Sequence, residues 1–118
     1  MANVLKGDFL MTDTEFQMVV DATLVQVEEY IESLVDRLDL DADSMRSGNV
    51  LTLDFEDKGK MILNSQVANH ELWLAAKSGG FHYQYVDGEW RDTRSKIPFK
   101  THFVELLSGQ IGQNCPAF

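Results

Sequence analysis

Residues 71–90 read ELWLAAKSGGFHYQYVDGEW and predict strands of an antiparallel sheet that are joined by tight turns. In the first of these strands, Leu72 and Leu74 flank Trp73, so the two leucines point to one face of the sheet and the tryptophan points to the other. Asp87-Gly88 is a strong hairpin signal because both residues tolerate a positive φ. Turns this short join neighbouring antiparallel strands.

The same alternation continues upstream of this stretch. Leu51, Leu53 and Phe55 are spaced to face a core from one strand, and Met61 and Leu63 are spaced to face it from the next. The predicted strands are Asp41 to Arg46, Val50 to Phe55, Lys60 to Gln66, Glu71 to Lys77, Phe81 to Val86 and a short strand around Trp90.

Two predicted helices flank the strands. Thr12 and Glu15 have the spacing of a capping box, and apolar residues then recur at steps of three and four. These apolar residues fall within an arc of roughly 80° on a helical wheel, which predicts a helix from about Asp13 to about Leu38 with one buried face. A second helix is predicted to begin after Pro98 and to end before Gly109.

The order of these elements predicts an α+β fold. We expect a two-layer α-β sandwich, with two helices packed on one face of an antiparallel sheet of about six strands. The other face of the sheet is then open to water or to a partner. Residues 1–10 are expected to form an N-terminal extension, residues 11–109 the domain, and residues 110–118 a frayed C-terminal tail.

Composition limits the possible partners. The 118 residues (13.4 kDa) include 19 acidic and 10 basic side chains, for a net charge of −9. A chain this acidic is poorly suited to nucleic acids or to anionic membrane surfaces, and its natural partners are cations or basic protein surfaces. The single cysteine, Cys115, excludes an internal disulfide and a cysteine-rich metal site within one chain. Without a stretch of ~20 apolar residues or a signal-peptide pattern, we expect a cytoplasmic protein.

The acidic residues are concentrated in the first half of the chain. Residues 1–57 carry 14 acidic and 3 basic side chains, a net charge of −11, whereas residues 58–118 carry 5 acidic and 7 basic side chains, a net charge of +2. On the long predicted helix the carboxylates cluster opposite the apolar stripe, and three aspartates continue the series past its end. This acidic ridge consists of Asp21, Glu28, Glu29, Glu32, Asp36, Asp39, Asp41 and Asp43.

Two interpretations of the acidic ridge stay open. Carboxylates are hard oxygen donors that suit Mg, Ca, Mn and iron. Neighbours such as Glu28 and Glu32 also repel each other by a few tenths of a kcal/mol, which a bound cation or a basic partner would offset. The alternative is a merely solvated helix face. Since no ligand spacing defines a closed cage, we expect metal binding to be open, exposed and weak.

The open face of the predicted sheet is the second candidate site. Trp73 is expected to lie exposed there, with Asn64 and Gln66 pointing the same way. An exposed tryptophan beside amides is typical of an interaction anchor, and the alternative is a tryptophan covered by a loop such as Val67 to His70. Surface or structural roles are expected for the three histidines, His70, His82 and His102.

The stretch from Leu72 to Tyr83, LWLAAKSGGFHY, resembles the signature of the frataxin family, in particular its bacterial CyaY-type branch. Asn64-Ser65-Gln66, Gly88-Glu89-Trp90 and the opening Met11 to Phe16 support this resemblance, which covers about residues 11–109. Three positions depart from the usual pattern of the family, namely Gln17, Ser65 and Glu71.

The resemblance implies an α-β sandwich and a non-enzymatic role in iron–sulfur cluster assembly, as an iron donor or as an iron-dependent regulator. The implied cofactor is iron (Fe2+ or Fe3+), weakly bound at surface carboxylates, with other divalent or trivalent cations as alternatives. The implied partners are the cysteine desulfurase and the scaffold protein. The metal and desulfurase surface would be Asp13, Asp21, Glu28, Glu29, Glu32, Asp36, Asp39, Asp41 and Asp43. The assembly-complex surface would be Asn64, Gln66, Trp73 and His82.

Two competing functions are retained. One is an acidic interaction module that docks on a basic partner surface, with metal binding incidental. The other is an enzyme such as a ferroxidase, which we rank last because the sequence contains no enclosed metal constellation. We expect a monomer, with iron-dependent oligomers as an alternative.

Overall fold

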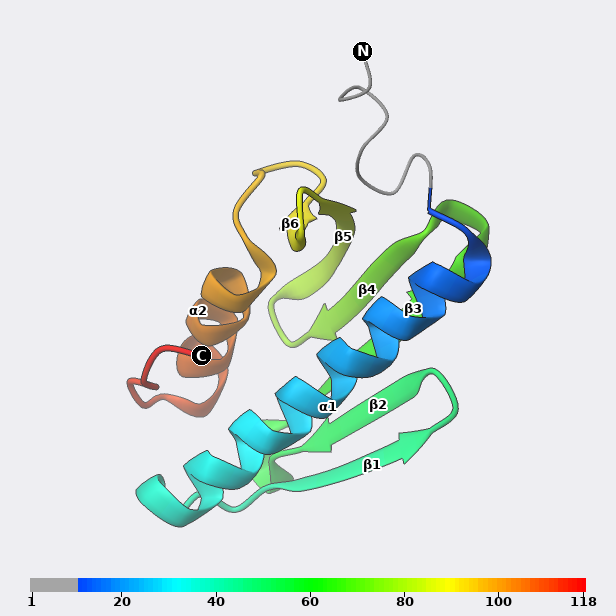
Figure 1. The fold of residues 1–118 in the computed structure, drawn as a ribbon. Helices are drawn as coiled ribbons and strands as arrows, with labels where there is room; N and C mark the ends of the chain where they lie inside the picture. Colours follow the sequence, from blue (N-terminus) through cyan, green and yellow to red (C-terminus); the bar gives the residue numbers. More distant parts are fainter. Residues whose placement is uncertain (1–10) are drawn as a thin grey trace.

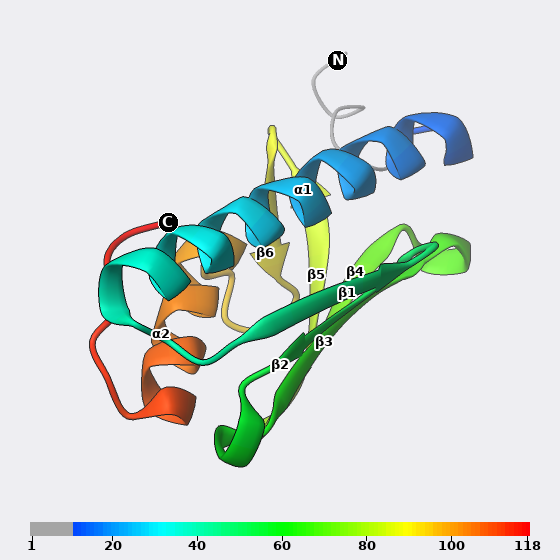
Figure 2. The ribbon, with the colours of Figure 1, turned by 90° about the horizontal axis from the view of Figure 1, so that it is seen from below.

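A computed structural model describes residues 11–118, and the predicted N-terminal extension over residues 1–10 lies outside the described residues. Two α-helices lie on one face of a six-stranded antiparallel sheet with strand order β1-β2-β3-β4-β5-β6 (Figures 1 and 2). This confirms the predicted α+β sandwich. The elements are α1 (Asp13–Leu38), β1 (Asp43–Ser47), β2 (Val50–Asp54), η3 (Glu56–Lys58), β3 (Lys60–Gln66), η4 (Val67–Asn69), β4 (Glu71–Ala76), β5 (Gly79–Val86), β6 (Glu89–Asp92) and α2 (Phe99–Ile111).

The long helix α1 has the predicted bounds. Its capping box is present, since the backbone N–H of Glu15 donates to Thr12 Oγ1 at 3.0 Å and the backbone N–H of Thr12 donates to Glu15 Oε1 at 2.9 Å. Asp39 ends the helix in the left-handed conformation, with φ of 54°. Among the described residues, no helix combines the length and the apolarity that crossing a membrane requires.

The core forms where the apolar stripe of α1 packs on the inner face of the sheet. Strand alternation places Leu51, Leu53, Met61 and Leu63 on this inner face, and all four are fully buried. Each such side chain contributes roughly 1.5–3 kcal/mol on burial. The α1 residues that complete this layer are Phe16, Val20, Leu24, Val27, Tyr30, Ile31 and Leu34.

The strands follow the prediction with shifted ends. β1 begins two residues later than predicted and runs to Ser47, β2 stops at Asp54, β4 stops at Ala76, and β5 begins at Gly79. The predicted hairpin turn is confirmed, because Asp87 and Gly88 both have positive φ, 52° and 85°.

The predicted end of α2 before Gly109 is wrong. The helix continues to Ile111, which is buried, and ends at Gly112, whose φ of 73° and N–H bond to the Ser108 carbonyl form the C-cap. Glycine inside a helix costs about 1 kcal/mol relative to alanine. The burial of Leu107 and Ile111 on either side of Gly109 outweighs that cost.

The C-terminal tail is packed against the helices, so the expectation that it is frayed is also wrong. The Tyr30 hydroxyl donates to the Pro116 carbonyl at 2.6 Å, and the Phe118 ring stacks on Tyr30 with centroids 4.5 Å apart. Burial raises the pKa of Tyr30 to about 12, with a further contribution from Cys115, so the hydroxyl keeps its proton and acts as the donor. The tail therefore closes one end of the core.

A buried chain of polar groups links β6 to α1. The indole N–H of Trp90 donates to Thr23 Oγ1 at 2.8 Å, and the Thr23 hydroxyl donates to the Val19 carbonyl at 2.9 Å. Trp90 is 4% exposed and Thr23 is 7% exposed, so water does not replace these bonds. The chain sets the position of the β5–β6 hairpin against the long helix.

Replacing Thr23 with valine tests this link. T23V keeps the shape of the side chain but leaves the buried Trp90 N–H without an acceptor, so the free energy of unfolding is expected to fall by about 1–3 kcal/mol. Urea denaturation measures the loss. T52V is the matched control, because Thr52 lies on the open face of the sheet with no buried partner, and its stability is expected to change by less than about 0.5 kcal/mol. Equal effects of the two substitutions would contradict the assignment.

Candidate functional site

The acidic ridge occupies the outward side of α1, the connection to β1 and the start of β1. Glu28 is half-buried, whereas the six ridge carboxylates that follow it in the chain are exposed. Asp43 belongs to β1 and points to the open face of the sheet, because its neighbour Ser44 pairs with buried Leu53 on the other face. The ridge thus reaches from the helix to the edge of the open sheet face. The exposed members are Glu29, Glu32, Asp36, Asp39, Asp41 and Asp43.

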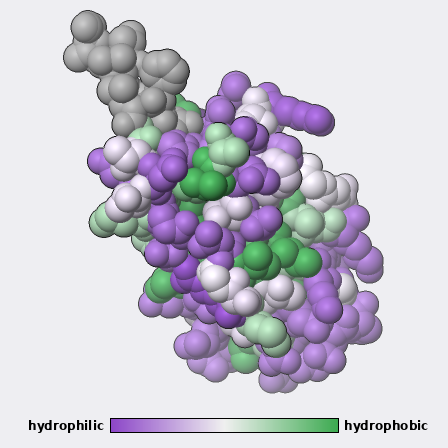
Figure 3. All heavy atoms as spheres, turned by 90° about the vertical axis from the view of Figure 1, so that its right-hand side faces the viewer, coloured by the Kyte–Doolittle hydropathy of each residue, from purple (hydrophilic) through white to green (hydrophobic). Residues whose placement is uncertain are grey.

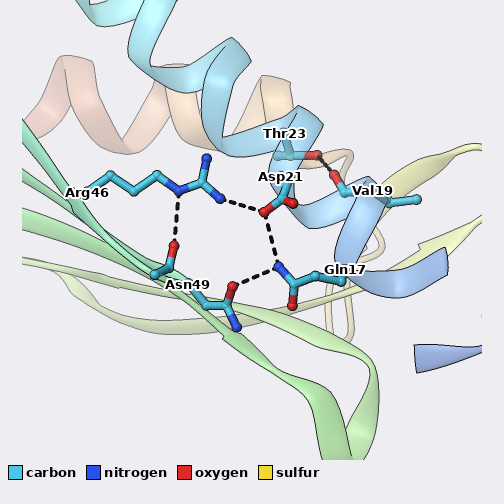
Figure 4. A network of polar contacts seen from close by, with 7 residues as sticks. Gln17, Val19, Asp21, Thr23, Arg46 and Asn49 are labelled. Atoms are coloured by element: carbon cyan, nitrogen blue, oxygen red, sulfur yellow. Dashed lines mark hydrogen bonds and ion pairs between the residues drawn. The ribbon is translucent and has the colours of Figure 1, made fainter. Parts of the chain in front are cut away.

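Asp21 differs from the rest of the ridge because its carboxylate is already paired. Figure 4 shows Arg46 reaching from β1 to Asp21, with Arg46 Nη2 at 2.5 Å from Asp21 Oδ1. The same oxygen accepts from Gln17 Nε2 at 3.1 Å, and Gln17 also donates to Asn49 Oδ1 at 2.7 Å. This network ties the first half of α1 to the β1–β2 turn.

Asp13, the other predicted ligand near the helix start, is also engaged. Its Oδ1 lies 2.8 Å from His70 Nε2, and the His70 ring stacks on Phe16 with centroids 4.8 Å apart. His70 therefore has the structural role that was predicted for it, since it holds the β3–β4 connection against the start of α1.

Seven ridge carboxylates remain without an ion pair or hydrogen bond to the described residues. They do not form a closed coordination shell, because residues 11–118 contain no group of three or more His, Cys, Asp or Glu side chains arranged to hold a metal. A hard cation would meet these oxygens singly or in pairs and stay largely hydrated. The seven are Glu28, Glu29, Glu32, Asp36, Asp39, Asp41 and Asp43.

The open face of the sheet presents Trp73 at its centre. Asn64 on β3 and His82 on β5 are its direct cross-strand neighbours, so these three side chains lie in one row. The next row contains Gln66, Glu71 and Gln84. The structure thus brings together the four residues predicted for the assembly-complex surface.

Trp73 is half-buried rather than fully exposed, and His82 and Glu71 contact its ring. The His82 ring stacks on the indole with centroids 4.2 Å apart and an interplanar angle of 3°. The indole N–H donates to Glu71 Oε1 at 2.8 Å, and His82 Nδ1 lies 3.5 Å from the same oxygen. The rings of Trp73 and His82 are therefore parallel on the open face, and the Glu71 carboxylate lies beside the indole nitrogen of Trp73 and Nδ1 of His82.

Two residues in this arrangement, Arg46 and Glu71, were not predicted as site residues. Arg46 reaches Asp21 from 25 positions away in sequence, so local pattern carries no signal for that pair. Glu71 carries a weak signal, because a residue two positions before Trp73 on a strand shares its face.

The surface around the β1–β2 and β3–β4 turns is mostly hydrophilic, with apolar side chains gathered in small separate patches (Figure 3). Exposed apolar residues in this part of the sheet are Met45, Val50 and Val67. Met45 and Val50 lie on the open face, which adds apolar area beside the Trp73 row.

A buried polar cluster on the other face has a structural role. The Tyr83 hydroxyl lies 2.6 Å from His102 Nδ1, and Asp92 Oδ2 lies 3.5 Å from the same nitrogen. The cluster joins β5, β6 and α2. Burial alone would raise the pKa of Asp92, but hydrogen bonds from the backbone N–H groups of Arg94 and Ser95, together with nearby His102, outweigh it and lower that pKa below its ordinary value of 3.8.

The fold and these two surfaces define a small acidic α-β sandwich of the frataxin type. Residues 9–117 match the frataxin-like domain family, and the chain belongs to that family. The resemblance carried by Leu72 to Tyr83 is thereby confirmed.

Bacterial proteins are among the relatives with similar sequences. The chain is 45% identical over 103 residues to the iron-sulfur cluster assembly protein CyaY of Paraburkholderia xenovorans (strain LB400), covering 87% of this chain and 94% of the relative. It is 46% identical over 103 residues to the protein of the same name from Janthinobacterium sp. (strain Marseille), covering 86% and 92%. These relatives are named as assembly proteins and not as enzymes.

Solved structures that are similar to this one belong to the same family. Frataxin from Psychromonas ingrahamii superposes with a TM-score of 0.72 at 34% identity, covering 89% of this chain and 96% of that one. Trimeric frataxin from the yeast Saccharomyces cerevisiae, complexed with ferrous iron, superposes with a TM-score of 0.69 at 26% identity, covering 80% and 86%.

Cation titration distinguishes the paired from the unpaired carboxylates. We expect E32Q to weaken binding of Mn2+ by about threefold, because it removes an unpaired charge, and D21N to change it by less than about 1.5-fold, because Arg46 already neutralises Asp21. R46A is expected to strengthen binding by freeing Asp21. Isothermal titration calorimetry measures all three affinities, and equal losses for D21N and E32Q would show that the Arg46 pair does not matter.

The Asp92 cluster predicts a defined dependence of stability on pH. Because folding lowers the pKa of Asp92, its contribution is fully present above the ordinary pKa of 3.8 and is lost as the pH falls through the lower folded-state pKa. D92N is expected to lower the free energy of unfolding by about 1–3 kcal/mol at pH 7 and by much less near pH 3. Urea denaturation between pH 3 and 7 measures this, with exposed D57N as the control. A loss that is the same at both pH values would contradict the role of the charge.

Proposed function

We propose that this protein binds iron weakly at the acidic ridge and modulates iron–sulfur cluster assembly as an iron donor or an iron-dependent regulator. The observation that carries the proposal is the one-sided placement of seven unpaired carboxylates on α1, its connection to β1 and the start of β1, beside an open sheet face with Trp73 at its centre. The relatives that are named iron–sulfur cluster assembly proteins support the process, and the yeast frataxin complexed with ferrous iron supports the metal.

The acidic ridge is proposed to dock on a basic surface of the cysteine desulfurase. Unpaired carboxylates on an exposed helix steer a basic partner and raise its association rate, and they do so less as salt screens them. The screening length falls from about 10 Å at 0.1 M salt to about 3 Å at 1 M. Docking is therefore expected to depend strongly on ionic strength.

The open sheet face is proposed to contact the scaffold protein. Its central row combines the indole of Trp73, the amide of Asn64 and the imidazole of His82, and Gln66 lies in the next row. A tryptophan surrounded by polar side chains is typical of an interface hot spot. Because Asp43 brings the ridge to the edge of this face, desulfurase and scaffold are proposed to sit side by side on one continuous surface.

Iron is proposed to act as cargo or signal at the ridge. Single and paired carboxylates hold a hydrated hard cation weakly, which allows its release to a partner and also reduces the negative charge that the desulfurase meets. The protein is proposed to be non-enzymatic, to act in the cytoplasm as a monomer, and to form oligomers only when iron bridges copies through the ridge.

A specific observation favours a second candidate function. The described residues contain no group of three or more potential ligands that could hold a metal. An acidic interaction module, with iron binding incidental, accounts for the ridge through docking alone.

A reconstituted assay of cluster formation tests the proposal. Desulfurase, scaffold, cysteine and iron are combined with and without the protein at several iron concentrations, and cluster formation is followed by absorbance and circular dichroism. The protein is expected to change the rate in a manner that depends on iron, and the triple variant E28Q/E29Q/E32Q is expected to lose most of this effect. The charge-matched control is E56Q/D57N/E105Q, which removes three exposed carboxylates outside the ridge.

The outcomes separate the candidates. An unchanged rate at every iron concentration would overturn the proposed function. A triple variant that loses desulfurase binding but titrates iron like the wild type supports the interaction module instead. Desulfurase binding that is unaffected by 0.5 M salt would overturn electrostatic docking.

A further inference from the structure

Three side chains on the open face form a single hydrogen-bonded and stacked unit. Trp73 and His82 stand on neighbouring strands as parallel rings 4.2 Å apart, and Glu71 accepts the indole N–H of Trp73 at 2.8 Å. His82 Nδ1 lies 3.5 Å from the same Glu71 oxygen. The unit is built by strand geometry, because Glu71 and Trp73 are two positions apart on β4 and Trp73 pairs directly with His82 on β5.

Glu71 is the least accessible polar member of the unit. Its side chain is 14% exposed, whereas that of His82 is 47% exposed. A carboxylate with so little access to water is stabilised by the donors around it. The indole has one donor, so the direction of its N–H sets the rotation of the whole ring, and the Glu71 oxygen determines that direction.

We propose that Glu71 is a positioning residue for partner docking: it holds the Trp73 indole upright against His82 so that the exposed part of the ring is presented in one orientation. This rests on the proposed function, in which the open face contacts the scaffold protein. An anchor that is already held in its bound orientation loses less conformational freedom on binding, which strengthens the complex. Glu71 acts through Trp73 and needs no contact of its own with the partner.

The proposal assigns the role to the acceptor oxygen and not to the charge. E71Q retains a carbonyl oxygen at the same reach, so it is expected to keep the indole hydrogen bond. E71A removes the acceptor and frees the ring. The matched control is Q84A, because Gln84 is the direct cross-strand partner of Glu71 on the same face and has no hydrogen bond to Trp73.

The first measurement needs no partner. The indole N–H signal of Trp73, assigned with a W73F variant, is followed in 1H–15N spectra for its exchange with water. Exchange is expected to be at least about fivefold faster in E71A and unchanged in E71Q and Q84A. The indole N–H of Trp90, bonded to Thr23 in the core, is the internal reference. Equal exchange in E71A and the wild type would overturn the proposal.

The second measurement is the binding of the scaffold protein by surface plasmon resonance. Loss of one positioning hydrogen bond, worth about 1 kcal/mol, is expected to weaken binding about fivefold in E71A. The loss is expected mainly in the dissociation rate, because association is steered by charges elsewhere. E71Q is expected to stay within about twofold of the wild type.

The double variant E71A/W73A separates positioning from direct contact. If Glu71 acts only through Trp73, then E71A has no further effect once Trp73 is alanine. An additional loss in the double variant overturns the positioning role. If W73A weakens scaffold binding and E71A does not, positioning is overturned while the proposed function stands. If W73A itself leaves scaffold binding unchanged, docking on this face is overturned.

Discussion

The packing of α1 against one face of the sheet is the constraint on which the remaining structure depends. The helix buries one apolar stripe on the leucine and methionine side chains of the inner face, and this burial leaves the opposite sides of both layers in water. The carboxylates then have to lie on the far side of the helix, and Trp73 has to lie on the far side of the sheet. The packing of α1 on the sheet therefore determines where both candidate surfaces lie, the acidic ridge and the open face with Trp73.

Polar contacts between distant residues adjust this packing. Trp90 with Thr23 fixes the β5–β6 hairpin on the helix, and Arg46 with Asp21 fixes the β1–β2 turn. The second contact has a consequence for the acidic ridge, since it withdraws one carboxylate and leaves the unpaired ones toward the C-terminal half of α1 and β1. The unpaired carboxylates of the acidic ridge are therefore concentrated toward the end of α1 and the edge of the open sheet face.

The long helix and the alternation of the strands were predictable because each depends on residues that are near in sequence. A capping box spans four residues, and a strand shows its two faces within a few positions. The end of α2 was not predictable in this way. Gly109 has the local signature of a helix stop, but the buried side chain of Ile111 and the cap at Gly112 carry the helix beyond it. The packed tail depends on Tyr30, which is 86 positions from its partner Pro116.

Local patterns therefore established the fold class, the acidic ridge and the face on which Trp73 lies, because periodicity and charge are properties of short stretches. Contacts between elements distant in sequence established which carboxylates are unpaired and how the C-terminal tail packs against the helices. Arg46 and Asp21, or Trp90 and Thr23, meet only after the helix and strands have packed, and no spacing along the chain encodes that distance. The chemistry of the site is thus set by side chains whose partners are brought together by the burial of the core.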